Sequence, residues 1–152
     1  MAKVLIKKLN PKVELPAYKT DGASGMDLMA FIEEPIRIAP NSSSLVPTGL
    51  SMAFSEDYEV QIRPRSGLAA KFGVTVLNTP GTIDSDYCGD GEDFELKVIL
   101  INHNKIPFSI KHGDRIAQMV VAKLADHELI EVEEFGKTDK TSRKGGLGST
   151  GK

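Results

Sequence analysis

The sequence predicts an all-β protein with one short helix, and two observations support that fold class. Runs of apolar and β-branched residues recur with turn formers between them, at the spacing of roughly 8–12 residues that is typical of a sandwich or barrel. Only residues 66–72 have the pattern of a helix, which amounts to about two turns. The sequence contains no visible internal repeat.

The most regular strand signal lies at residues 58–63, where apolar and polar side chains alternate. This two-residue period is typical of a strand with one buried face, which here carries Tyr58, Val60 and Ile62. Ser66 is expected to cap the N-terminus of the helix that follows. The other expected strands are apolar or β-branched runs, at residues 3–9, 74–77, 96–101, 106–110 and 116–124.

Length and composition limit the possible functions. The 152 residues make about one domain, and a net charge of −2 argues against a nucleic-acid partner. Cys88 is the single cysteine, which excludes an intramolecular disulfide and a cysteine-based zinc cluster. The apolar runs are too short to cross a membrane, and the first residues do not form a signal peptide. We therefore expect a cytoplasmic protein without a membrane partner.

The sequence predicts two parts, a β domain at residues 1–135 and a flexible, glycine-rich C-terminal arm at residues 136–152. The arm holds five Gly, five Ser or Thr and five basic residues against one Asp, so its charge is +4 and the rest of the chain carries −6. Such a segment cannot bury enough apolar surface to order itself. It is either a disordered tail or an arm that orders over a phosphate-bearing ligand.

Three short motifs suggest functions that their context does not support. Residues 146–151 match G-x-G-x-x-G, but a dinucleotide site needs a strand before them and a helix after them. Residues 136–138 resemble the end of a P-loop, but Glu131 stands where that loop needs glycine. Residues 84–95 place several acidic residues on a calcium-loop template. There Cys88 replaces an oxygen ligand, and the flanks are predicted strands rather than helices.

Five other segments, taken together, carry a more specific signal. In order and spacing they closely resemble the five motifs of the trimeric dUTP pyrophosphatases (dUTPases), and the resemblance runs from about residue 13 to the end. The segments are Gly22-Ala23-Ser24-Gly25-Met26-Asp27-Leu28, Pro64-Arg65-Ser66-Gly67-Leu68, residues 78–89, Gly113-Asp114-Arg115-Ile116-Ala117-Gln118, and residues 143–151.

The resemblance implies a jelly-roll-like β-barrel of the β-clip type, assembled as a homotrimer with active sites shared between subunits. It also implies hydrolysis of dUTP to dUMP and pyrophosphate with Mg²⁺, the C-terminal arm closing over the substrate. Such an enzyme is a dUTP diphosphatase, which lowers dUTP and supplies dUMP for thymidylate synthesis.

The matched positions imply a role for each site residue. Asp84 matches the aspartate that activates the attacking water, and Asp27 matches the one that reaches Mg²⁺ through water. The residues matched to substrate binding are Arg65, Ser66, Gly67 and Gln118 at the phosphates, Asn78, Gly81, Thr82, Ile83, Tyr87 and Lys97 around the nucleoside, and Arg143, Leu147, Gly148, Ser149 and Thr150 in the arm. Asp114 and Arg115 are interpreted as structural, as a turn and an intersubunit ion pair.

The sequence departs from the family pattern at several places. Cys88 replaces a polar residue, and residues 90–94 are a five-residue insertion. The insertion is either an acidic surface turn, whose deletion would leave turnover mostly intact, or a lip near the pocket. Leu147 stands where a phenylalanine usually stacks on uracil. Arg143 is one residue closer than usual to the glycine pair, so Lys140 or Lys144 is an alternative γ-phosphate ligand.

Three other functions remain as alternatives. A dCTP deaminase would use the same fold, and a nucleotide-binding regulator would use the same pocket to engage a protein partner. The third alternative is the calcium-binding loop at residues 84–95.

Overall fold

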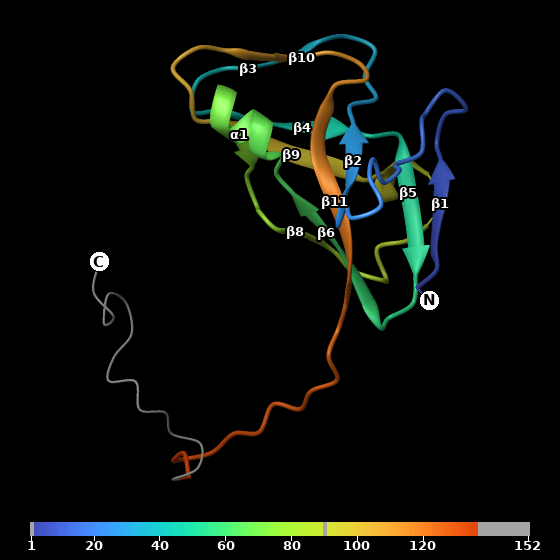
Figure 1. Cartoon of the computed structure of the whole chain (residues 1–152), viewed down its shortest axis with the longest axis vertical. Helices are drawn as coiled ribbons and strands as arrows, with labels where there is room; N and C mark the ends of the chain where they lie inside the picture. The colour runs from blue at the N-terminus through green and yellow to red at the C-terminus, as the bar shows by residue number, and fades with distance from the viewer. Residues whose placement is uncertain (1, 90, 137–152) are drawn as a thin grey trace.

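The computed structural model describes residues 2–89 and 91–136, in which short strands surround one small helix (Figure 1). The helix is α1 (Ser66–Phe72), and a single 3-10 turn, η1, covers Glu92–Phe94. The strands of this part are β1 (Val4–Lys8), β2 (Met26–Met29), β3 (Ile36–Ile38), β4 (Ser43–Pro47), β5 (Leu50–Phe54), β6 (Tyr58–Arg63), β7 (Val74–Val76), β8 (Gly81–Ile83), β9 (Lys97–Asn102), β10 (Phe108–Ile110) and β11 (Arg115–Lys123).

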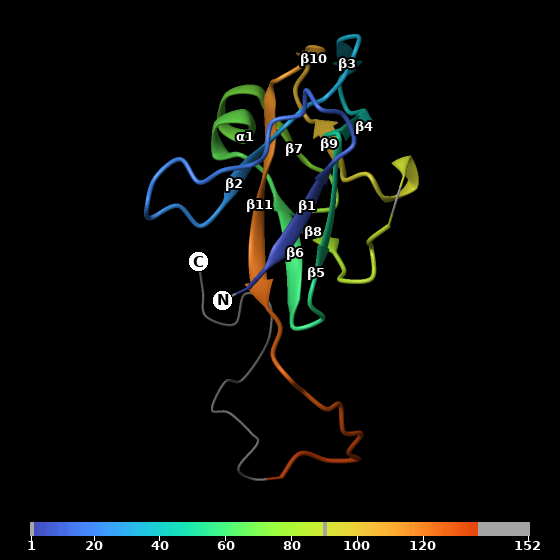
Figure 2. The same ribbon diagram turned by 90° about the vertical axis from the view of Figure 1, so that its right-hand side faces the viewer.

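All strand pairs in the described residues are antiparallel, and they form four small sheets. The largest has the order β2-β11-β6-β8, the second has the order β4-β9-β7, and β1-β5 and β10-β3 are two-stranded. Figure 2 shows these sheets wrapped around a common interior. The all-β prediction with one short helix is confirmed and fits a jelly-roll-like arrangement. The ladders of the described residues do not, however, close into a continuous barrel.

One hydrophobic core joins the sheets. It collects aliphatic side chains from most strands, including Leu28 on β2, Val60 and Ile62 on β6, Leu100 on β9 and Met119 on β11. The alternation predicted for residues 58–63 is confirmed, since Val60 and Ile62 are buried while Arg63 is exposed. Burial of each such side chain stabilises the fold by about 1.5–3 kcal/mol.

The helix begins where it was predicted, but its cap differs from the prediction. Ser66 is the first helical residue, and Arg65 is the N-cap, with φ −93° and ψ 127° and no side-chain cap hydrogen bond. The Arg65 carbonyl accepts hydrogen bonds from the N–H groups of Leu68 and Ala69. A guanidinium has only donors, so the Arg65 side chain cannot accept from the helix N–H groups, and it pairs with Asp27 instead.

After β11 the chain leaves the packed body (Figure 1). The Leu124 N–H still donates to the Asp57 carbonyl, but every residue from 123 to 136 is exposed. The boundary at residue 135 stays a prediction, and the arm at 137–152 lies outside the described residues. No helix in the described part has the length and apolar character to span a membrane.

Candidate active site

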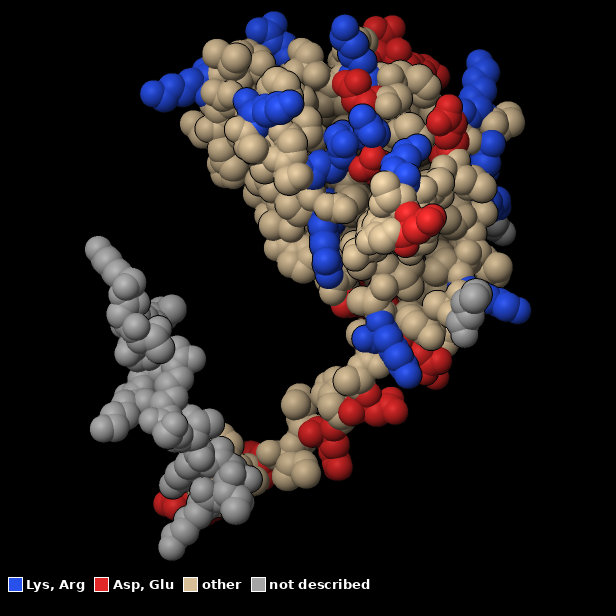
Figure 3. All heavy atoms as spheres, in the orientation of Figure 1, with Lys and Arg blue, Asp and Glu red and all other residues tan. Residues whose placement is uncertain are grey.

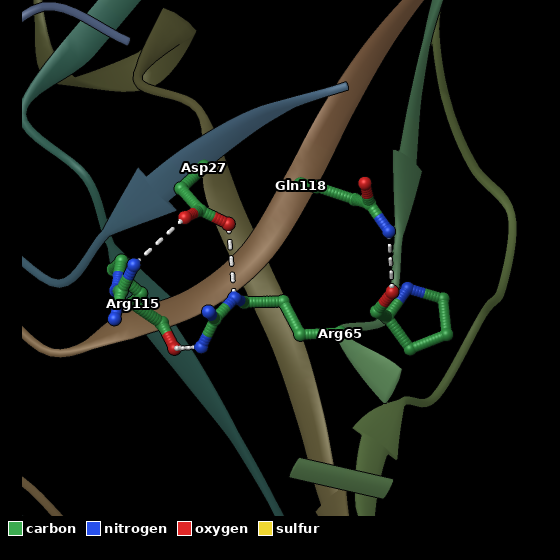
Figure 4. A network of polar contacts seen from close by, with 5 residues as sticks. Asp27, Arg65, Arg115 and Gln118 are labelled. Atoms are coloured by element: carbon green, nitrogen blue, oxygen red, sulfur yellow. Dashed lines mark hydrogen bonds and ion pairs between the residues drawn. The ribbon is translucent and has the colours of Figure 1, made fainter. Parts of the chain in front are cut away.

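A charged network centred on Asp27 occupies the face where β2 and β11 lie side by side (Figure 4). The Nε of Arg65 donates to Oδ1 of Asp27 at 2.9 Å, and Nη1 of Arg115 donates to Oδ2 at 3.4 Å. Nη1 of Arg65 also donates to the Arg115 carbonyl at 3.1 Å. The Arg65 guanidinium is therefore held by Asp27 and by the Arg115 carbonyl, and the Arg115 guanidinium is held by Asp27.

Strand register explains why these residues meet. Asp27 on β2 pairs with Gln118 on β11, and Gln118 pairs on its other side with Arg63 at the end of β6. The chain then turns through Pro64 and brings Arg65 back over Asp27. A register shift between Arg115 and Ala117 accompanies the approach of Arg115 to the same carboxylate.

Gln118 is placed by two contacts beside this network. Its Nε2 donates to the Pro64 carbonyl at 3.0 Å. On the other side, a Cβ added to Gly25 would lie 2.5 Å from its Oε1. Glycine at position 25 therefore leaves the space that the Gln118 amide occupies.

The network can bind an anion. Two guanidiniums share one carboxylate, so one positive charge remains, and the Arg115 side chain is 53% exposed. Figure 3 shows basic side chains gathered on this face around a small acidic spot. Ser66 and Gly67, at the start of α1, are exposed, and the first N–H groups of a helix lack intrahelical partners. This combination suits phosphate oxygens.

Within the chain Arg115 pairs with Asp27, and its interpretation as an intersubunit ion pair stays a prediction. Nothing in the sequence pattern pointed to that pairing, because the two residues are far apart in the chain. The interpretation of Asp114 as a turn residue is confirmed, since its Oδ2 accepts from the Lys111 N–H at 2.8 Å.

A second group of predicted residues surrounds the hairpin at β8. A pocket of about 220 Å³ lies beside Asp84, lined by Leu45, Thr82, Ile83, Asp84, Tyr87, Glu95, Leu96, Lys97 and Ile99. The Tyr87 N–H donates to the Asp84 carbonyl at 3.1 Å, which turns the chain directly after β8. Leu45, Leu96 and Ile99 are lining residues that no motif had indicated, and Glu95 had been considered only within the calcium-loop template.

Asn78 and Gly81 shape the start of this hairpin. Gly81 is buried, and a Cβ there would lie 3.3 Å from Nδ2 of Asn78 and 3.3 Å from Cβ of Ile62. The Asn78 amide thus covers the Gly81 backbone. Both predicted residues are close together, although Asn78 is not among the residues that line the pocket beside Asp84.

The two groups of predicted site residues do not meet in one chain. Strands β11 and β8 lie on the two sides of β6. Gln118 on β11 pairs with Arg63, and Ile83 on β8 pairs with Val60. Strand geometry therefore separates the Cα atoms of Gln118 and Ile83 by about 14 Å, from a rise of about 3.3 Å per residue and a strand spacing of about 4.8 Å. The pocket beside Asp84 includes neither Arg65 nor Gln118.

The described residues do not support the calcium-loop alternative. They contain no group of three or more His, Cys, Asp or Glu side chains arranged to hold a metal ion. Oε1 of Glu95 accepts from the Gly49 N–H at 2.8 Å, and Oε2 lies 3.9 Å from Nζ of Lys97. The flanks are strands rather than helices: β9 was predicted, and so was β7 (Val74–Val76), but β8 next to the loop was not, and Asp90 lies outside the described residues.

Part of the insertion contacts Tyr87, which lines the pocket, but Asp93 and Phe94 do not line it themselves, so the surface turn and the lip both stay predictions. The Tyr87 hydroxyl donates to the Asp93 carbonyl at 3.0 Å, and the ring of Phe94 lies 5.8 Å from the ring of Tyr87. The predicted arm residues, by contrast, lie outside the described residues: Arg143, Leu147, Gly148, Ser149 and Thr150.

Comparisons with known proteins agree along nearly the whole chain. The family model described as dUTPase matches residues 11–151. The deoxyuridine 5'-triphosphate nucleotidohydrolase of Neorickettsia sennetsu is 51% identical over 150 residues, which cover 99% of this chain and 96% of that protein. The protein of the same description from Wolinella succinogenes is 53% identical over 150 residues, 99% of this chain and 95% of that one.

Solved structures show the same fold. The dUTPase of Staphylococcus bacteriophage 80alpha with dUPNHPP superimposes with a TM-score of 0.82 at 22% identity, covering 98% of both chains. A dUTPase from phage phi11 of S. aureus, described with a structural Mg(II) ion, has a TM-score of 0.74 at 21% identity. It covers 88% of this chain and 98% of that one.

Proposed function

This chain belongs to the dUTPase family, and we infer that it is a dUTP diphosphatase, which hydrolyses dUTP to dUMP and pyrophosphate. The single observation that carries this inference is the identity of about half the residues over 99% of the chain to dUTP nucleotidohydrolases. Such an enzyme lowers dUTP and supplies dUMP for thymidylate synthesis.

Asp84 is the proposed general base. Its carboxylate is exposed, lines the pocket and makes no hydrogen bond or ion pair with the described residues. It is therefore available to orient a water and accept its proton as the water oxygen attacks the α-phosphorus. The bond from the α-phosphorus to the bridging oxygen breaks, and pyrophosphate leaves.

Arg65, Ser66, Gly67 and Gln118 are the proposed phosphate ligands. The support is the cationic network described above, in which the Arg65 guanidinium is already oriented by Asp27 and the Arg115 carbonyl. Orientation before binding reduces the entropy lost when the triphosphate is held. Gly67 has open space where a side chain would stand, which leaves room for an approaching phosphate.

Asp27 fits a Mg²⁺ ion held mainly by the triphosphate. Mg²⁺ commonly keeps several waters and takes one or two carboxylates together with substrate phosphates. Because both carboxylate oxygens of Asp27 already pair with arginines, Asp27 suits contact through water rather than direct ligation. When bound, Mg²⁺ would offset the negative charge that develops on the phosphates.

The hairpin is the proposed nucleoside site. The Asn78 amide can donate to a uracil carbonyl and accept from N3–H, and Gly81, Thr82 and Ile83 present backbone groups along β8. The Tyr87 ring, which lines the pocket, is proposed to pack on deoxyribose and to leave no room for a 2′-hydroxyl. Lys97 lines the same pocket as Asp84 and supplies a positive charge.

We propose a homotrimer with shared active sites, and two observations support it. The phosphate group and the nucleoside group are separated within one chain, which is the arrangement expected if a complete site combines groups from different subunits. In addition, the segment that leaves the body exposes Leu129, Ile130, Val132 and Phe135, with Leu129 90% exposed. Exposed apolar residues in such a run indicate a surface for a partner chain.

The arm is proposed to close this shared site, with Arg143, Ser149 and Thr150 donating to phosphate oxygens. Leu147 and Gly148 would cover the base. We propose the cytoplasm as the location, since the exposed thiol of Cys88 suits a reducing compartment.

The activity is tested by measuring pyrophosphate release from dUTP, with UTP, dTTP and dCTP as controls. We expect release from dUTP alone and its loss when EDTA removes Mg²⁺. Conversion of dCTP with release of ammonia would instead support the deaminase alternative. Binding of dUTP without turnover would support the nucleotide-binding regulator.

The shared site is tested by mixing two inactive variants, Asp84→Asn and Arg65→Gln. If each site combines Asp84 of one subunit with Arg65 of another, random trimers of the two variants regain about a quarter of the wild-type sites. No activity in the mixed trimers would show that both residues act from the same chain. Each variant assembled alone is the matched control.

A further inference from the structure

Asp93, Phe94 and Glu95 contact Tyr87 through its ring and its hydroxyl. We propose that Phe94 is a positioning residue, which holds the Tyr87 ring against the substrate sugar and thereby sets the discrimination between dUTP and UTP. This inference rests on the proposed function, because it assigns a cause to the placement of Tyr87 in that same site.

The Phe94 ring packs between the Tyr87 ring and the backbone of Gly89. It lies 5.8 Å from the Tyr87 ring with the planes at 60°, a geometry in the favourable range for aromatic pairs. On another side it lies so close to Gly89 that a Cβ there would come within 2.4 Å of a ring carbon. The absence of a side chain at Gly89 therefore leaves the space that the Phe94 ring occupies.

The Tyr87 hydroxyl is fixed by the same segment. It lies 3.0 Å from the Asp93 carbonyl oxygen and 3.3 Å from the Glu95 carbonyl oxygen, and donates toward both. The two carbonyls flank Phe94, so ring contact and hydroxyl contact come from three successive residues. A tyrosine has two main side-chain torsions, and these contacts restrain both the ring and its tip.

The segment is itself anchored to the core. Oε1 of Glu95 accepts from the Gly49 N–H at 2.8 Å, and the Leu96 N–H donates to the Leu50 carbonyl at 2.7 Å. Gly91, at φ 104°, makes the turn that returns the chain from Gly89 to Phe94. Tyr87 therefore rests on a support connected to β5 rather than on a loose surface turn.

Without this support the Tyr87 ring would be poorly placed. It is 38% exposed, so it lacks enough other packing to hold one rotamer. A ring that moves away from the sugar makes room for a 2′-hydroxyl, so selectivity falls more than turnover of dUTP. The insertion would then be a determinant of sugar selection, and deletion of residues 90–94 would lower selectivity even where turnover of dUTP stays mostly intact.

The test compares kcat/KM for dUTP and for UTP in the full-length protein. Phe94→Ala should lower the dUTP-to-UTP ratio about tenfold, on the scale that a pocket achieves against one added hydroxyl. Gly89→Ala, which displaces the ring from the other side, should lower the ratio in the same direction. Phe94→Leu, which keeps apolar bulk, should restore part of it.

The matched control is Phe108→Ala. It removes one ring of the Phe72–Phe108 pair, whose centroids lie 5.4 Å apart and which lines no part of the Asp84 pocket. This control should keep the wild-type ratio even where stability falls. An unchanged ratio in Phe94→Ala, in a protein that remains folded, would overturn the proposal.

A second readout does not depend on catalysis. The chain has three tyrosines, so 3-fluorotyrosine gives a simple ¹⁹F spectrum in which Tyr87→Phe identifies the Tyr87 resonance. Phe94→Ala should shift and broaden that resonance, whereas Phe108→Ala should leave it in place. If the wild-type protein fails to hydrolyse dUTP, the proposed function is wrong, while the ¹⁹F spectrum still decides whether Phe94 positions Tyr87.

Discussion

The two ends of β6 carry two different kinds of site. Near Arg63, the side chains of Asp27, Arg65 and Gln118 are fixed by one another and by backbone carbonyls. Near Val60, Asp84 is exposed and makes no hydrogen bond or ion pair with the described residues through its side chain. The first site is organised by charge before any ligand binds, while the second is organised by the backbone and leaves its reactive group free.

This difference has a physical reason. Phosphate ligands gain from being held in place, because the anion that they receive is large and highly charged. A general base must instead approach a water and take its proton, and a carboxylate tied up in ion pairs would do so poorly. Substitutions at the two ends should therefore separate effects on stability from effects on chemistry.

The largest expected effect is at Asp84. Asp84→Asn removes the proton acceptor and should lower kcat about 10²–10⁴-fold. Because the side chain has no partner among the described residues, the free energy of unfolding should change by less than about 0.5 kcal/mol. Pyrophosphate release and urea unfolding measure the two quantities. Retained turnover would remove Asp84 from the mechanism.

Substitution of Asp27 should lower the free energy of unfolding more clearly than it lowers activity. Asp27→Asn leaves Arg65 and Arg115 without their shared counter-charge on a carboxylate that is only 19% exposed. We expect a loss of about 1–2 kcal/mol in unfolding free energy, between the values for exposed and buried pairs. A smaller loss of activity should accompany it, with a raised requirement for Mg²⁺.

The control for this variant is Glu56→Gln, which neutralises an exposed acid away from the network. Urea unfolding of both variants gives the comparison. Equal stability of Asp27→Asn and the wild type would show that the arginines find other partners, and that the network is not held together by Asp27.

Gly25 offers a milder way to disturb the phosphate end. In Gly25→Ala the new Cβ would meet Oε1 of Gln118 at 2.5 Å, so the amide must move away from the Pro64 carbonyl. The loss of one well-placed hydrogen bond, worth about 1 kcal/mol, should raise KM for dUTP about fivefold.

The matched control is Gly22→Ala in the same motif, because a Cβ at Gly22 would meet nothing within 4 Å. Steady-state kinetics on both variants separates the effect of the contact from the effect of adding a methyl group. Equal KM values for the two variants would mean that Gln118 does not bind the phosphates.

Local pattern predicted the elements that are locally determined. The alternation at Tyr58–Arg63 and the helix at Ser66–Phe72 both have the expected bounds. The sequence did not reveal β2, β3, β4, β5 and β8, which span three to five residues each. A strand such as Ser43–Pro47 has little β propensity of its own and exists because it pairs with residues of β9 that lie 50 to 58 positions away in the sequence.

In the site, too, the identity of the residues could be predicted from the sequence, but their contacts could not. The five motifs predicted which residues belong to it, but their order along the chain contains no information about contacts. The Asp27–Arg65 pair joins residues 38 positions apart, so no local pattern in the sequence indicates it. Nor could Phe94 be connected with Tyr87 from composition, because the insertion is mostly acidic and typical of a surface turn.

The smallest expected effect concerns the nucleoside end and its proposed cover, at Leu147. Leu147→Phe places an aromatic ring where leucine already covers the base with apolar surface. Base–aromatic stacking is worth about 1–3 kcal/mol, and the leucine contributes part of that, so KM for dUTP should fall about two- to fivefold. Leu15→Phe, at an exposed leucine in the N-terminal part of the chain, is the control. An unchanged KM in Leu147→Phe would argue that the arm does not close over the base. In that case the nucleoside end would depend on the hairpin alone, and the support of Tyr87 would matter more for selectivity.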